Sequence, residues 1–114
     1  MSREFLDFVE DILDAMDKAE ILVEGFTYEE FEADFRTNFV VIRALEIIGE
    51  ASKRVPMDVR RQYPEIPWRG MAGMRDRIIH GYDTVDLQIV WDVVQQDIPE
   101  IKPQVQRILA DYTA

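Results

Sequence analysis

Residues 27–54 read TYEEFEADFRTNFVVIRALEIIGEASKR, and this stretch decides the fold class. Thr27 and Glu30 have the spacing of a capping box, a pair that satisfies free backbone N–H groups where a helix begins. Apolar side chains then recur at steps of three and four residues, which is the period of an α-helix. We predict a helix to about Arg54, with a break near residues 36–37, where helix propensity dips. Its apolar row is predicted to lie in the core: Phe31, Phe35, Phe39, Ile42, Leu45, Ile48 and Gly49.

The helical period continues through the rest of the chain. A helix is predicted from Trp68 to about His80, with Gly81 as its left-handed exit. The last helix is predicted to begin after Thr84 or Asp86, either of which can cap it. No stretch alternates apolar and polar residues convincingly, as a half-buried strand would. The sequence therefore predicts an all-α bundle of four or five helices, which forms a single domain over the whole chain, residues 1–114.

The composition excludes several classes of function. The chain has 114 residues and 13.4 kDa, which is room for one domain. It has no cysteine, so disulfides, thiolate zinc sites and a cysteine nucleophile are excluded, and its one histidine cannot build a multi-histidine metal site alone. The longest apolar run covers residues 39–42, so no membrane span is predicted. The acid-rich N-terminus lacks the apolar core of a signal peptide, and we expect a cytoplasmic protein.

Charge is distributed unevenly along the chain, whose formal net charge is −10. Residues 1–52 carry 14 acidic and 4 basic side chains, whereas residues 53–77 carry 7 basic and 3 acidic ones. An acidic protein is a poor general nucleic-acid binder, because phosphate affinity comes largely from Lys and Arg. Six of the seven cations in residues 53–77 are arginines, which suit bidentate contacts with phosphate. This segment is either a solvated cationic edge or a phosphate-binding surface, and charge alone does not separate the two.

Residues 74–82 read MRDRIIHGY and hold the single histidine. Histidine is the residue type most often used in general acid–base catalysis, which makes His80 a candidate, and Arg75 can stabilise charge on a phosphoryl group. Tyr82 can orient a phosphate or stack on a base, and on a helix Asp76 would be spaced to hold a His80 imidazolium. These residue types suit metal-free RNA cleavage, in which the 2′-OH attacks phosphorus. The alternative is a histidine that only favours the dipole at a helix end.

The spacing Arg75-x4-His80-x-Tyr82 matches the signature of HepT-like proteins of the HEPN superfamily. The resemblance covers roughly residues 5–109 in order and spacing, through the blocks RALEIIGEA (43–51), YPEIPW (63–68) and VW (90–91). It implies a HEPN-type up-and-down helical bundle that forms a homodimer, with two copies of the motif in one cleft. On an ideal helix Arg75 and His80 point about 140° apart, so a second copy would help to bring such groups together.

The resemblance also implies an activity and a partner. It indicates an endoribonuclease toxin that needs no metal and no cofactor, with Arg75 and His80 as catalytic residues and an RNA substrate such as tRNA or mRNA. The implied partner is an antitoxin, a minimal nucleotidyltransferase of the MntA type, which transfers AMP from ATP to Tyr82. Two other interpretations stay open. The chain could be a non-catalytic, nucleotide- or substrate-binding subunit of such a transferase, or a purely structural bundle.

Three charged residues share one face of the helix predicted over residues 27–54. Arg43, Glu46 and Glu50 are spaced at i, i+3 and i+7. They are either an exposed ladder of ion pairs or a support that fixes the rotamer of Arg75. The resemblance of this block to the family favours the supporting role. Gly49, on the same helix, is predicted to permit the close approach of another helix.

Overall fold

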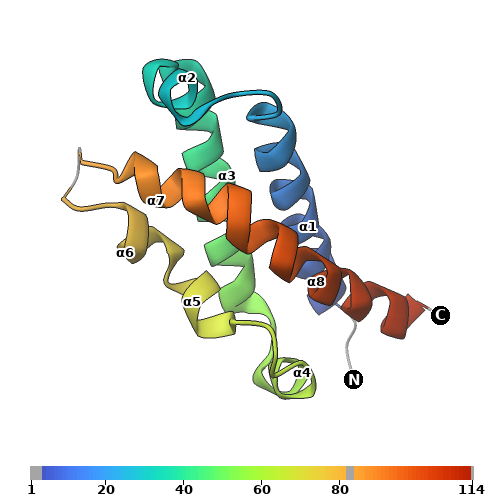
Figure 1. Cartoon of the computed structure of the whole chain (residues 1–114). Helices are drawn as coiled ribbons and strands as arrows, with labels where there is room; N and C mark the ends of the chain where they lie inside the picture. The colour runs from blue at the N-terminus through green and yellow to red at the C-terminus, as the bar shows by residue number, and fades with distance from the viewer. Residues whose placement is uncertain (1–3, 82–83, 114) are drawn as a thin grey trace.

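Three long helical segments surround the hydrophobic core. Their bounds are α1 Phe5–Leu22, α3 Phe35–Arg54, and the continuous run of α7 Leu87–Asp92, π-helical η1 Val93–Asp97 and α8 Ile98–Thr113. The computed structural model describes residues 4–81 and 84–113. In it α1 and α3 pack side by side, and the run from α7 to α8 crosses them (Figure 1). Each segment contributes fully buried side chains, among them Ile12, Leu45 and Ile108.

Short helices occupy the connections between the long ones. They are α2 Tyr28–Ala33, α4 Met57–Gln62, α5 Trp68–Ala72 and α6 Met74–Ile78. The predicted capping box at the start of α2 is confirmed, because Thr27 N–H donates to Glu30 Oε1 (2.9 Å) and Glu30 N–H donates to Thr27 Oγ1 (3.2 Å). The break after α2 falls at Asp34, not at residues 36–37. The Asp34 carboxylate accepts hydrogen bonds from the backbone N–H groups of Arg36 and Thr37, and so caps α3.

The prediction of an all-α fold is confirmed. In the described residues the only β pairing is one isolated bridge, between Ile79 and Val85. The predicted number of four or five helices is too low, since the described residues form eight α-helices and one π-helical turn. The difference arises because Asp34, Gly73 and the π-helical turn η1 each divide a segment that was predicted to be one helix. None of the helices in the described residues is long and apolar enough to cross a membrane.

The apolar row of α3 is only partly buried, which corrects the prediction. Leu45 and Ile48 lie in the core, but Phe35 and Phe39 keep 63% and 69% of their surface exposed. The buried row of α3 instead includes Asn38, about 100° round the helix from Phe39. The polar Asn38 can lie there because its side-chain amide donates to two carbonyl oxygens of α2 (3.2 and 3.3 Å). Two aromatic rings are left on the surface of α3.

Candidate active site

A glycine contact sets the position of α6, the helix that carries the motif arginine. A Cβ on Gly49 would lie 3.0 Å from the Met71 carbonyl oxygen of α5 and 3.4 Å from Met74 Cβ of α6. The predicted close approach at Gly49 is therefore confirmed, and its partners are the ends of two short helices. Gly73 separates these helices, with φ −87° and ψ 11°. The single helix predicted from Trp68 to about His80 is wrong, because the chain bends at Gly73.

The segment after α6 is an antiparallel turn. Helix α6 ends at Ile78, and Ile79 is extended, with φ −108° and ψ 122°. Ile79 pairs with Val85, and Asp86 N–H donates to the Ile78 carbonyl oxygen (2.8 Å). Asp86 then caps α7 by accepting from Ile89 N–H (3.1 Å). The turn is thus fixed at both of its ends by helices.

His80 lies inside this turn and is fixed through its backbone. Its N–H donates to the Thr84 carbonyl oxygen at 2.7 Å, and its side chain is exposed. Gly81 follows with φ +80°, the left-handed conformation that was predicted for it, but three residues after the end of α6. An ordered backbone with a ring open to solvent is the arrangement that a general acid or base needs when its substrate arrives from outside.

The end of α6 at Ile78 changes the relation between the motif residues. Arg75 is exposed on α6, and its carbonyl oxygen accepts a hydrogen bond from the N–H of Ile79 (2.9 Å). His80 is the residue after Ile79. The angle of about 140° predicted between Arg75 and His80 assumed one continuous helix and does not apply. The helical spacing of Asp76 and His80 is lost for the same reason. No ion pair joins these two side chains within the described residues.

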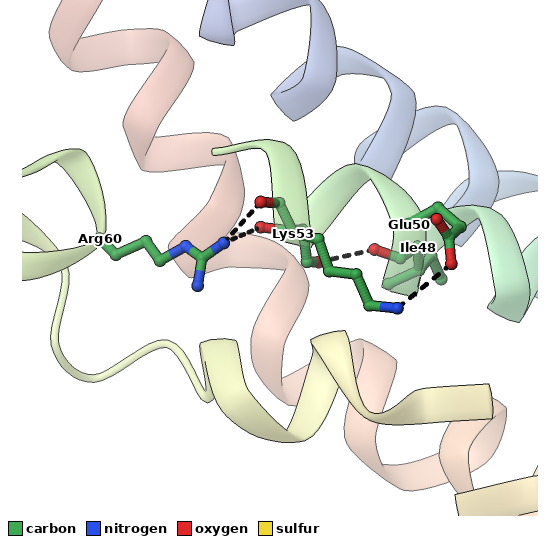
Figure 2. Close-up of polar contacts among 5 residues, drawn as sticks. Ile48, Glu50, Lys53 and Arg60 are labelled. Atoms are coloured by element: carbon green, nitrogen blue, oxygen red, sulfur yellow. Dashed lines mark hydrogen bonds and ion pairs between the residues drawn. The ribbon is translucent and has the colours of Figure 1, made fainter. Parts of the chain in front are cut away.

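Arg60, a cation of the basic segment, has a structural role. Its guanidinium donates to the carbonyl oxygens of Ser52 (2.8 Å), Lys53 (2.9 Å) and Val55 (2.8 Å), as Figure 2 shows for the first two. These carbonyls end α3 and have no partners within the helix. Arg60 therefore caps the C-terminus of α3 and is not free to bind phosphate.

The remaining cations of residues 53–77 divide into two groups. Lys53 pairs with Glu50 (3.3 Å), Arg77 pairs with Asp97 (3.1 Å), and Arg54 lies over the ring of Phe8 at 5.8 Å. Three exposed arginines have no ion-pair or hydrogen-bond partner among the described residues: Arg61, Arg69 and Arg75. Arg69 and Arg75 belong to the successive helices α5 and α6, and α6 leads directly into the His80 turn.

Of the other predicted site residues, Glu50 has a partner on its own helix. Glu50 pairs with Lys53 (Figure 2), as in an exposed ladder of ion pairs. Within the described residues, no hydrogen bond or ion pair links Arg43, Glu46 or Glu50 to Arg75. Tyr82 lies outside the described residues. The supporting role of the three charged residues stays a prediction.

Shifted ionisation marks contacts that hold the bundle together, away from this turn. Burial, together with the hydrogen bond from Tyr63 to Asp111 (2.7 Å), raises the pKa of Tyr63 to about 12. Hydrogen bonds to Asp17 and Glu20 of α1 raise the pKa of Lys102 on α8. Within residues 4–81 and 84–113, no group of three or more His, Asp or Glu side chains could hold a metal ion.

A cavity that sequence reasoning missed lies beside α6. It has a volume of about 340 Å³ and is lined by residues of five helices, including Met74 and Arg77 of α6 and Gln104 of α8. Helical periodicity places Met74 and Gln104 near a core, but it does not show that the packed helices leave space between them. The sequence signal that could have hinted at it is Gln104, a polar residue at an inward position of the last helix.

The chain is thus an all-α bundle in which Arg75 lies on the helix that leads into the exposed turn of His80, with the spacing Arg-x4-His. Comparison of the sequence with known families and proteins agrees. Residues 12–108 match the family described as ribonuclease HepT-like. The chain belongs to this HepT-like family, and the enzyme class that the membership gives is an RNA-cleaving nuclease.

Curated relatives are similar over nearly their whole length. A protein of Thermococcus cleftensis named "Probable ribonuclease HepT" is 47% identical over 95% of this chain and 98% of its own. Two RNase-named proteins of Methanocaldococcus jannaschii are 42% and 43% identical, each over 96% of this chain and over 90% and 94% of their own. No solved structure gives a significant match.

Proposed function

We propose that this chain is a metal-independent endoribonuclease toxin of the cytoplasm, with Arg75 and His80 as its catalytic residues. The observation that carries the proposal is the exposed turn after α6, which holds the His80 backbone by a 2.7 Å hydrogen bond and leaves its side chain open to solvent. Arg75 is exposed on α6, the helix that leads into this turn. Membership of the HepT-like family supports RNA as the substrate.

The proposed reaction is a transesterification within the RNA. The His80 imidazole takes the proton of a 2′-OH, the 2′ oxygen bonds to the adjacent phosphorus, and the bond from phosphorus to the 5′ oxygen breaks. An acid returns a proton to that 5′ oxygen, so the products are a 2′,3′-cyclic phosphate and a 5′-OH. Arg75 stabilises the negative charge that builds on the phosphoryl oxygens. Neither a redox step nor an added nucleophile is needed.

We further propose that the active form is a homodimer that uses the surface of α3. Phe35, Phe39, Ile42, Glu46 and Gly49 form one row along this helix, because they are spaced at steps of four and three residues. The row begins with two exposed aromatic rings, whose centroids are 6.1 Å apart, and ends at the glycine that contacts α6. A second copy seated on the rings would therefore bring two α6 helices toward each other. Exposed aromatic side chains are typical of such contacts.

Regulation is proposed to act through Tyr82. The tyrosyl oxygen attacks the α-phosphorus of ATP on a minimal nucleotidyltransferase antitoxin, pyrophosphate leaves, and AMP stays on the tyrosine as a phosphodiester. The added bulk and negative charge, seven residues from Arg75, would compete with RNA for the free arginines. The acidic outer side of α1, with Asp7, Glu10 and Asp14 exposed, is proposed to bind the antitoxin. Neutralising these acids should then weaken assembly of the pair.

Cleavage of RNA in EDTA by matched variants tests the function. We expect His80→Ala and Arg75→Ala each to cut at least about 100-fold more slowly, because loss of a general acid–base or a charge-stabilising group costs about that much. The control Arg61→Ala removes an equally exposed arginine from α4 and should cut like the original protein. If the original protein binds the transferase but neither it nor any variant cuts RNA, the chain is a non-catalytic subunit of the transferase instead. AMP transfer should block cutting by the original protein but not by Tyr82→Phe.

A further inference from the structure

The cavity beside α6 has an apolar interior. Its inner wall consists of methionine and isoleucine side chains that are nearly fully buried, from α1, α3, α5, α6 and α8. They include Met16, Ile48, Met71, Met74 and Ile98. The volume of about 340 Å³ is in the range of small-molecule sites. Flexible thioether side chains can adapt to the shape of a ligand.

The rim of the cavity is acidic. Glu65, Asp97 and Glu100 line it together with a single cation, Arg77. Arg77 Nη1 already pairs with Asp97 Oδ2 at 3.1 Å. Neither Glu65 nor Glu100 has an ion-pair partner in the part of the chain that the structure describes. Two carboxylates are thus left uncompensated at the mouth, on a protein of formal net charge −10.

One polar atom of a lining residue has no partner among the residues that the structure describes. Gln104 Oε1 is buried, and no hydrogen bond from those residues reaches it. A buried acceptor without a donor is unfavourable, and native proteins have few of them. Gln104 lines the cavity, and rotation of its side-chain amide would bring this oxygen to a donor bound there.

The helix behind the cavity departs from α geometry at this place. Val93 and Asp97, the first and last residues of η1, both line the cavity. A π-helical turn widens a helix locally and occurs often at functional sites. The widened turn, the unpaired acceptor and the uncompensated carboxylates converge on one cavity, although each is a separate observation.

We propose that this cavity binds a small organic cation, a protonated amine with an apolar body. The apolar body contacts the methionine wall, and the positive charge lies near Glu65 and Glu100 at the mouth. The Gln104 amide turns toward the ligand, so that an N–H group donates to Gln104 Oε1. The site is distinct from the His80 turn, and its occupancy does not depend on ribonuclease activity. Met74 and Arg77 flank Arg75 on α6, so the ligand and the proposed nuclease site share this helix.

Methionine methyl NMR tests the proposal directly, because three methionines line the cavity and Met57 is exposed elsewhere, on α4. The probes are 2-phenylethylammonium, neutral 2-phenylethanol and anionic 3-phenylpropanoate, which share a phenylethyl body. We expect saturable shifts at Met16, Met71 and Met74 with the cation, and none at Met57. The alcohol should bind at least about tenfold more weakly, and the anion should not bind.

Two glutamine variants complete the test. Gln104→Leu removes the acceptor at nearly constant volume and should weaken binding of the cation at least about tenfold. Gln106→Leu, on the exposed side of the same helix, should leave it unchanged. The dispersed methyl signals of the buried Met16, Met71 and Met74 without ligand report that each variant is folded. The proposal fails if no lining methionine shifts, if Met57 shifts in parallel, if the three probes bind equally, or if Gln104→Leu binds like the original protein.

Discussion

Arg60 and Arg75 are the same side chain in opposite surroundings. Arg60 binds three carbonyl oxygens at the end of α3, whereas Arg75 is exposed without a partner in the described residues. Charge counting over residues 53–77 gives both the same weight. In the structure Arg60 is held by backbone carbonyls and Arg77 is paired with Asp97, so the guanidinium groups without a partner in the described residues are those of Arg61, Arg69 and Arg75. Fewer cations are therefore free to meet a phosphate than charge counting suggests.

Single residues with a local physical role were predicted well. Thr27, Glu30, Gly49 and Asp86 act in the structure as their patterns indicated, since capping and close approach depend on neighbours in sequence or on the lack of a side chain. The predicted pairing of Asp76 with His80 is wrong, because it assumed a helix to residue 80 and α6 ends at Ile78. A sequence predicts roles that depend on neighbouring residues, but it does not predict how a side chain is oriented beyond the end of a helix.

At the scale of elements, the junction of α3 with α5 and α6 decides where the site lies. Its contact point is Gly49, where any Cβ would press on the Met71 carbonyl at 3.0 Å. A backbone carbonyl yields only if the whole of α5 moves. Because α6 follows after Gly73, such a shift would carry Arg75 with it. The spacing of these short helices from α3 thus depends on the absence of a Cβ at Gly49.

We therefore expect Gly49→Ala to lower the free energy of unfolding by about 1 kcal/mol. Overpacking costs about 1–3 kcal/mol, and the gain in helix propensity returns about 1. The control is Gly70→Ala on α5, whose added Cβ would have only Pro67 Cβ nearby, at 3.9 Å. It should raise stability by about 0.5–1 kcal/mol. Urea unfolding measures both, and equal stabilisation by the two variants would show that the contact at Gly49 is not tight.

The long helices were predictable from periodicity and the division of the short ones was not. The run through α3 follows from its apolar spacing and its capped start. The turn at His80 depends on the pairing of Ile79 with Val85 and on two backbone hydrogen bonds across it. Those contacts form only when packing of the core brings α6 and α7 together. The sequence pattern favours a helix to residue 80, but the tertiary contacts hold Ile79 in an extended conformation.

For the whole molecule, the exposed aromatic row of α3 is the feature that a monomer leaves unexplained. Phe35 and Phe39 were predicted to be core residues, and the structure instead places them on the surface. The proposed dimer would bury them again. It would also join the free arginines of two copies into one positive field on an otherwise acidic protein.

Phe39→Glu should therefore convert the dimer into a monomer. A carboxylate at the centre of an apolar contact must be desolvated without a partner, which is costly. The control Ile21→Glu changes a side chain that is equally exposed, on α1 (68% against 69%). Sedimentation equilibrium should give a dimer mass for Ile21→Glu and for the original protein. A dimer that survives Phe39→Glu would place the interface on another face.

The most direct measurement is the chemistry of the RNA ends produced in EDTA. Once a cut has been mapped, the same RNA is made with a single 2′-deoxynucleotide on the 5′ side of the scissile bond. Attack by the 2′ oxygen predicts a 2′,3′-cyclic phosphate and a 5′-OH from the unmodified RNA, and no cut in the modified one. Cutting of the deoxy substrate at an equal rate, or ends that carry a 3′-OH and a 5′-phosphate, would contradict the role given to His80 and Arg75.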